Sequence, residues 1–196
     1  MTHPDSSSEQ GVSCTERWRA RLDWLDFWFQ PEKTAMHDFG SSERELFDTL
    51  APAWLAAEAG AGKIAVLESM SERFGRERVL TLLGEMCENE TRGHWSEVTR
   101  GEGSSLDDLV RLVWTPLLER GFEFTSESRP NGIQLCVTRC PNAELGARLN
   151  AADWLSALIC AGDPHVAASF DPPIRFERTT TLMRGDDCCN HAYFVD

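Results

Sequence analysis

Basic residues are scarce in this sequence. Its 196 residues include 19 lysines and arginines against 32 aspartates and glutamates, which gives a formal net charge of −13 at pH 7. Proteins that hold nucleic acid or anionic membranes electrostatically need clustered lysine and arginine. The charge therefore argues against nucleic-acid and membrane partners, although one local arginine is enough to bind an anionic small molecule.

Long apolar runs are also missing. No stretch approaches the roughly 20 apolar residues of a transmembrane helix, and the polar segment Met1 to Cys14 has no apolar signal core. We therefore expect a cytoplasmic protein with reduced thiols. The seven cysteines are Cys14, Cys87, Cys136, Cys140, Cys160, Cys188 and Cys189. Cys87 and Cys136 are interpreted as small core residues; for the others, metal binding, catalysis and plain burial stay open.

Internal repeats are absent too, and the length suits one domain or a core with a helical extension. We expect a flexible tail over 1–14, a helical region over 15–120 and an α+β region over 121–196 that carries the candidate site, the last two forming one globular unit. Apolar residues at helical spacing predict a first helix over 15–30. Its aromatic face indicates packing against the domain or against a second copy of the chain, as in a homodimer.

Further helices are predicted by apolar periodicity and by glycine breaks. Ser41 or Ser42 is expected to cap a helix that ends near Gly60, with Glu45 as capping-box partner and Pro52 as a kink. Three more helices are expected over 64–74, over 77–95 and from Ser105 to Gly121.

After Gly121 the apolar residues alternate. This pattern predicts strands over 122–126 and 133–137, with Pro130, Asn131 and Gly132 forming the turn of a hairpin. Helices are then predicted over 141–149 and 151–160, followed by strands over 174–183 and 189–195 joined by a turn at 184–187. The order predicts an α+β fold, in which an N-terminal helical region precedes an antiparallel sheet with packed helices.

Cys140 directly precedes Pro141, and proline is favoured in the first turn of a helix. At a helix N-terminus, exposed N–H groups and the helix dipole stabilise a thiolate. Cys140 is therefore a candidate site residue. The alternative is a small residue that ends a strand.

Cys160 and Asp163 lie three residues apart, a spacing that places two side chains on one face of a helix. Gly162 and Pro164 indicate that a helix ends here. Asp163 is therefore equally suited to cap the short run 165–169. A capping carboxylate can also belong to a site.

The C-terminal segment contains Cys188, Cys189 and His191. In a strand, residues two apart point the same way, so Cys189 and His191 are expected on one face and Cys188 on the other. The thiol and imidazole can form an ion pair that activates the thiolate, or they can ligate zinc; a surface histidine is the plain alternative. In the preceding strand, Arg175 or Arg178 can meet a substrate carboxylate.

Four short motifs occur in order. They are Cys140-Pro141, Cys160-Ala161-Gly162-Asp163, Phe170-Asp171-Pro172-Pro173 and Gly185-Asp186-Asp187-Cys188-Cys189-Asn190-His191. This ordered set of Cys-Pro, Cys-x-x-Asp, Phe-x-Pro and Gly-Asp-x-x-Cys-x-His resembles the pattern of the L-2-amino-thiazoline-4-carboxylic acid hydrolase family. It covers about the last third of the chain. It also resembles 4-vinyl reductase type domains, small-molecule-binding α+β modules that can hold a metal through cysteines.

The resemblance implies a set of site residues: Cys140, Cys160, Asp163, Gly185, Asp186, Cys189 and His191. Cys188 falls at a variable position of the pattern. The implied activity is ring-opening hydrolysis of an aminothiazoline carboxylate to a carbamoyl-cysteine. Cys189 or Cys160 would be the thiolate nucleophile, with His191 as base and Asp163 orienting or protonating.

Other readings stay open. Zinc held by Cys140, Cys160, Cys189 and His191 would activate water instead. A non-enzymatic module would sense a small molecule or a metal through the same cysteines. A biosynthetic tailoring enzyme would use the same site on another carbon–heteroatom bond.

Overall fold

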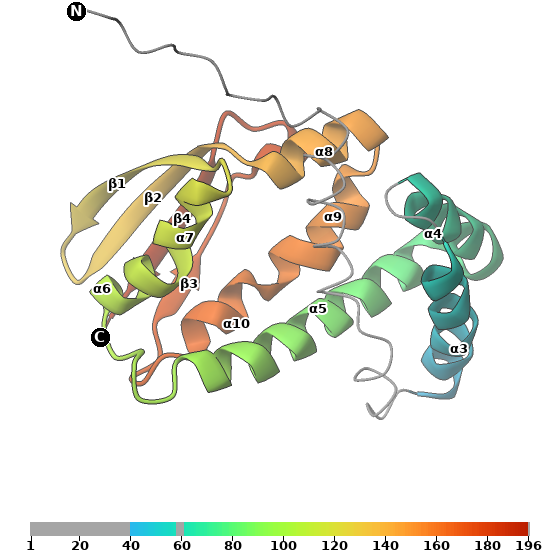
Figure 1. The fold of residues 1–196 in the computed structure, drawn as a ribbon, viewed down its shortest axis with the longest axis horizontal. Coiled ribbons are helices and arrows are strands. Elements are labelled where there is room, and N and C mark those ends of the chain that lie inside the picture. The colour runs from blue at the N-terminus through green and yellow to red at the C-terminus, as the bar shows by residue number, and fades with distance from the viewer. Residues whose placement is uncertain (1–39, 58–60, 196) are drawn as a thin grey trace, which may run out of the picture.

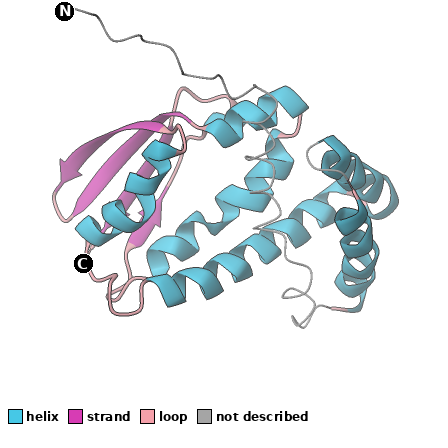
Figure 2. Cartoon of the chain, viewed as in Figure 1, coloured by secondary structure: helices cyan, strands magenta, loops and turns pink. Residues whose placement is uncertain are grey.

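The computed structural model describes residues 40–57 and 61–195 (Figure 1). The tail predicted over 1–14 and the helix predicted over 15–30 lie outside these residues, so the homodimer inferred from that helix stays a prediction. Helices come first, and a four-stranded antiparallel sheet lies at one end of the molecule (Figure 2). The predicted α+β fold is confirmed.

Three helices open the described chain. They are α3 (Ser41–Ala56), α4 (Ala61–Phe74) and α5 (Arg76–Val98). The capping box predicted at Ser41 or Ser42 is wrong, because Gly40 occupies the N-cap position and has no side chain to accept a hydrogen bond. The break predicted at Gly75 is present, and its φ of +92° is a conformation that only glycine adopts easily.

The helix predicted from Ser105 to Gly121 is interrupted by a π-helical turn. Its parts are α6 (Leu106–Leu109), the π-helix η1 (Val110–Trp114) and α7 (Thr115–Glu119). Pro116 has no N–H to continue the α-helical pattern. The N–H and the hydroxyl of Thr115 both donate to the carbonyl of Val110. Such π-turns are frequent at functional sites.

The sheet has the strand order β1-β2-β4-β3, and each neighbouring pair is antiparallel. The strands are β1 (Glu123–Arg129), β2 (Gly132–Arg139), β3 (Arg175–Glu177) and β4 (Cys189–Phe194). The predicted hairpin joins β1 to β2, and Asn131 in its turn has a φ of 58°. In Figure 1, α6 and α7 lie over one face of the sheet, which we call the inner face.

The connection between β2 and β3 is helical. It comprises α8 (Pro141–Leu149), α9 (Ala152–Ile159), the 3-10 turn η2 (Cys160–Gly162) and α10 (Asp163–Ala168). Helices α9 and α10 and the turn η2 pack along α5, which is the longest helix in view (Figure 1). This arrangement brings η2 and the start of α10 close to the sheet, since α10 also contacts β3.

The strand predicted over 174–183 is too long. β3 ends at Glu177, and the backbone then bonds to a side chain instead of a neighbouring strand. The Asn190 side-chain oxygen accepts the N–H of Thr179 at 2.9 Å and that of Thr180 at 2.7 Å. Alternation of residue types could not reveal that a side chain replaces the neighbouring strand as hydrogen-bond acceptor, because that side chain belongs to the following strand.

A second 3-10 turn, η3 (Leu182–Arg184), occupies the end of the same segment. Thr181 caps it by accepting the N–H of Met183 at 3.2 Å. Gly185 follows with a φ of +83°, which favours glycine. The predicted antiparallel pair β3–β4 is therefore present, with a long structured connection in place of a short turn.

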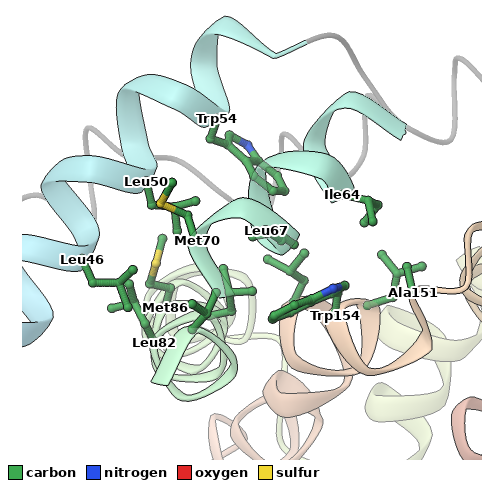
Figure 3. Close-up of a cluster of buried hydrophobic side chains, with 14 of the residues drawn as sticks. Leu46, Leu50, Trp54, Ile64, Leu67, Met70, Leu82, Met86, Ala151 and Trp154 are labelled. Atoms are coloured by element: carbon green, nitrogen blue, oxygen red, sulfur yellow. The ribbon is translucent and has the colours of Figure 1, made fainter. Parts of the chain in front are cut away.

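Two clusters of buried apolar side chains form the interior. The first lies among α3, α4, α5, α8 and α9 and includes Trp54, Leu67 and Trp154 (Figure 3). The second lies between the inner face of the sheet and the helices that cover it, and includes Leu109 and Leu135. Because α8 and α9 follow β2 in sequence, segments from both halves of the chain complete the first cluster.

Cys87 is 1% exposed and belongs to the buried interior, as predicted. The same prediction for Cys136 is wrong. In β2 the neighbours Leu135 and Val137 face the second cluster, so alternation turns Cys136 to the outer face of the sheet, where it is half-buried.

Among residues 40–57 and 61–195, no helix is both long enough and apolar enough to span a membrane.

We expect Leu67→Ala to lower the free energy of unfolding by about 2–5 kcal/mol, because it leaves a cavity in a close-packed cluster. Leu55→Ala is the matched control. Leu55 is 62% exposed, so its truncation should change stability by less than about 0.5 kcal/mol. Urea denaturation of both variants measures the difference, and equal losses would contradict the assignment of Leu67 to the core.

Candidate functional site

A cavity of about 470 Å³ lies between α5, the η1–α7 segment and the inner face of the sheet. Much of its wall is apolar, with side chains such as Trp95 and Leu117. Five of the seven site residues implied by the resemblance line it: Cys140, Cys160, Asp163, Cys189 and His191. Gly185 and Asp186 do not. Side chains far apart in sequence therefore share one chamber.

Strand β4 supplies two of these side chains. Cys189 and His191 are each 6% exposed and lie opposite Val137 and Leu135 of β2. Cys188 does not line this cavity. Its thiol forms a hydrogen bond with Cys136, which raises the pKa of Cys188. The alternation predicted for this segment is thus present, with Cys189 and His191 inward and Cys188 on the other side.

The loop before β4 holds the Cys189 thiol. The sulfur accepts the N–H of Leu182 at 3.2 Å and lies 3.5 Å from the hydroxyl of Thr181. The Thr181 N–H in turn donates to the Asp186 carboxylate at 2.6 Å. Asp186 therefore supports the loop that contacts Cys189, and it is absent from the cavity wall.

His191 and Asp163 face each other. The Nε2 atom of His191 lies 3.6 Å from Oδ2 of Asp163, while Nδ1 is buried without a hydrogen-bond partner among the residues that the structure describes. The alternative role of Asp163 as an N-cap is wrong. Asp163 has helical backbone angles as the first residue of α10, and Gly162 occupies the N-cap.

Arg178 forms an ion pair with Asp163 through the same carboxylate oxygen that faces His191. Its guanidinium also donates to the carbonyl of Cys160 at 3.3 Å. Arg178 was a candidate for a substrate carboxylate, as was Arg175. Arg175 is exposed and stacks over Phe194, 4.8 Å from the ring centre, away from the cavity wall.

The thiols of Cys140 and Cys160 are held in the neutral form. Burial raises the pKa of Cys140 from 9.0 to about 11, although the backbone N–H groups of Ala143 and Asn142 lower it. Burial, followed by the negative charge of Asp163, raises the pKa of Cys160 well above its usual value. Cys140 does occupy the N-cap of α8 as predicted. The expected thiolate stabilisation is nevertheless wrong in direction, because desolvation outweighs the helix N-terminus.

Zinc requires several thiolate, imidazole or carboxylate donors at coordinating distance of one point. Among residues 40–57 and 61–195, no group of three or more His, Cys, Asp or Glu side chains has that geometry. The donor set implied for zinc, Cys140, Cys160, Cys189 and His191, lines the cavity without converging as a metal centre.

Comparison with known families gives a match to the model described as L-2-amino-thiazoline-4-carboxylic acid hydrolase over residues 55–193. The chain belongs to this family. The match begins in α3 and ends in β4, so it extends far beyond the motifs between Cys140 and His191 that first indicated the resemblance.

No curated protein matches the chain. Among solved structures, the chain matches the crystal structure of the phenol-responsive sensory domain of the transcription activator PoxR with phenol. The two chains are 12% identical, the similarity covers 80% of this chain and 91% of that one, and the TM-score is 0.47.

In this member of the hydrolase family, two aromatic neighbours of His191 could not be identified from the sequence. Trp114 of η1 packs edge-on to His191 with ring centres 4.9 Å apart, and Phe176 of β3 lies 5.6 Å from the same ring. Helical spacing marks Trp114 only as apolar. The signal that could have drawn attention to it is Pro116, which stands inside a predicted helix and accompanies the π-turn.

We expect iodoacetamide to alkylate Cys140 slowly at pH 7 and faster as the pH approaches 11. A thiol is uncharged when protonated, so burial favours the protonated form. The stability that this contributes is complete below pH 9 and is lost as the pH rises through about 11. Mass spectrometry of the Cys140 peptide across pH measures the rate. The urea-unfolded chain, which should show an ordinary thiol profile, is the control; rapid labelling of the folded chain at pH 7 would contradict the expectation.

Gly162 allows η2 to approach α5 closely. A Cβ atom at Gly162 would overlap Oγ1 of the buried Thr91, with the Thr91 Cβ only 3.1 Å away. We expect Gly162→Ala to destabilise the protein by about 1–3 kcal/mol through overpacking and to displace the adjacent Asp163. Gly93→Ala in α5 is the control, because nothing lies within 4 Å of its Cβ position. That variant should gain about 0.4–1 kcal/mol. Thermal unfolding of both variants tests the pair, and an unchanged Gly162→Ala would refute the close approach.

Proposed function

We propose that this chain is a hydrolase that opens a carbon–sulfur or carbon–nitrogen bond in a small heterocyclic, amidine-like substrate, with Cys189 as the nucleophile. The observation that carries the proposal is the meeting of Cys189, His191 and Asp163 at one cavity, in a chain of the aminothiazoline carboxylate hydrolase family. A thiol, an imidazole and an orienting carboxylate are the groups that nucleophilic catalysis needs.

Cys189 is favoured over the other two thiols by its contacts. Burial raises the pKa of both Cys140 and Cys160 and so keeps them neutral. The Cys189 sulfur instead accepts the backbone N–H of Leu182 at 3.2 Å, a contact that fixes its position on the strand that also carries His191. Cys160 and Cys140 then shape the wall beside the reacting atoms.

His191 is proposed as the proton carrier. The Asp163 carboxylate faces its Nε2 atom, and the His191 side chain lines the cavity together with Cys189. The imidazole is therefore the group proposed to carry a proton between a thiol, a water and a leaving group in the cavity. Arg178 is a positioning residue, because it holds the Asp163 carboxylate and the Cys160 carbonyl together.

The chemical steps balance with one water. The Cys189 sulfur bonds to the ring carbon between nitrogen and sulfur while its proton passes to His191. The bond from that carbon to the ring sulfur breaks, and the leaving sulfur takes the proton from His191. Water then attacks the same carbon, His191 takes its proton, and the bond to Cys189 breaks as the thiol is reprotonated. The product is a carbamoyl compound with a free thiol.

The route draws only on this chain's side chains and needs no cofactor. We also propose a cytoplasmic location, where thiols stay reduced; the six cysteines among the described residues are free. A tailoring enzyme that acts on another carbon–heteroatom bond would use the same groups on a different substrate.

A ligand-binding module without turnover is the second candidate. It is supported by the mainly apolar wall of the cavity and by the neutral state that burial imposes on Cys140 and Cys160. Such a module would bind its ligand stoichiometrically and leave it unchanged.

We expect Cys189→Ser to abolish release of free thiol from 2-amino-thiazoline-4-carboxylate or a related thiazoline, because the hydroxyl is a far weaker nucleophile. His191→Gln should lower kcat roughly 10²–10⁴-fold through loss of proton transfer. A thiol-specific dye follows the product, and thermal unfolding verifies that both variants fold.

Cys188→Ser is the matched control for Cys189→Ser, since it changes the adjacent thiol outside the cavity wall. It should retain turnover. Full activity of the Cys189→Ser variant would overturn the nucleophile assignment, and wild-type protein that binds such thiazolines without releasing thiol would favour the binding module.

A further inference from the structure

The size and wall of the cavity bear on what the substrate looks like. Its volume of about 470 Å³ falls in the range of pockets that enclose drug-sized ligands, roughly 300–1,000 Å³. An aminothiazoline carboxylate is one five-membered ring with an amino group and a carboxylate. It would leave much of this space unfilled.

The additional space is bounded by apolar side chains. They come from five parts of the fold: Trp95 and Val98 of α5, Val113 of η1, Leu117 of α7, Phe122 before β1, and Val166 of α10. A small zwitterion gains nothing from such a wall, whereas an apolar group gains free energy in proportion to the area it buries.

The charged groups of the wall also argue against recognition of a substrate carboxylate. Arg178 is already ion-paired with Asp163 and bonded to the Cys160 carbonyl. A substrate carboxylate at this position would have to displace Asp163 from the guanidinium, at the cost of a partly buried ion pair. Arg120, the other guanidinium of the wall, is exposed at the end of α7.

His191 indicates where a polar part of the ligand would lie. It is 6% exposed and lines the cavity beside Cys189 and Asp163. These three side chains are polar groups in a mainly apolar wall, so a polar head of the ligand is expected beside them.

We infer that the substrate is an amidine-like heterocycle attached to an apolar, ring-sized or larger group, and that no carboxylate is required for its recognition. This inference rests on the proposed function for the reacting head, and on the cavity alone for the apolar body. The head lies against Cys189, His191 and Asp163, and the body lies along α5 and α7.

Two probes that share the head test the inference. 2-Amino-thiazoline-4-carboxylate carries the carboxylate, and its 4-benzyl analogue carries an apolar ring at the same position. Binding to the full chain is measured by rapid-mixing tryptophan fluorescence, since Trp95 and Trp114 line the cavity, and turnover by thiol release. The benzyl analogue should bind at least about tenfold more tightly, because the ring buries apolar area that the carboxylate does not.

A pair of substitutions locates the effect. Leu117→Glu places a charge in the apolar wall and should weaken binding of the benzyl analogue at least about tenfold. Leu118→Glu makes the same change at the next residue, which is 51% exposed and outside the wall, and should leave affinity unchanged. Equal weakening by both variants would contradict the proposed position of the apolar group.

The outcomes separate the two proposals. Tight binding of the benzyl analogue without thiol release supports the inferred ligand class and overturns the hydrolase proposal. Binding and turnover of the carboxylate in preference to the benzyl analogue supports the hydrolase and overturns the inference. Failure of the benzyl analogue to bind overturns the inference as well.

Discussion

The ion pair between Arg178 and Asp163 is the constraint on which the site depends. It joins the connection after β3 to the first residue of α10, and the same carboxylate oxygen faces Nε2 of His191. Burying an isolated charge is costly, so each partner needs the other in this position. The carboxylate is thereby held beside β4, where it faces the imidazole of His191.

The three thiols of the cavity differ because their surroundings differ. Cys160 packs at the edge of the first apolar cluster, and Cys140 at the edge of the second. Burial raises the pKa of both. Cys189 belongs to the second cluster itself, but the loop through Thr181 and Leu182 directs polar groups at its sulfur. Three chemically identical groups therefore have different neighbours within one cavity.

Local pattern was enough to predict part of this arrangement. Alternation along 189–191 places Cys189 and His191 on one face, and Pro141 fixes Cys140 at the start of α8. The same rules could not give the partner of Arg178, the length of β3, or the role of Trp114. Those features depend on contacts across the fold: a carboxylate from α10, the Asn190 side chain, and a helix laid over the sheet. The periodicity of apolar residues predicts which face of a helix or strand is buried, but it does not predict which other element covers that face.

The cavity persists because its wall is shared between two separately packed interiors. Trp54, Leu67 and Trp154 close the first cluster among helices, and Leu109 and Leu135 belong to the second beneath the sheet. Neither cluster needs to collapse into the space between α5 and the inner face to bury its own side chains. An unfilled apolar chamber still forgoes contacts that close packing would supply. A ligand that fills it therefore adds stability by binding only the folded chain. Under the ligand class inferred above, the apolar group would supply the contacts that this part of the wall offers.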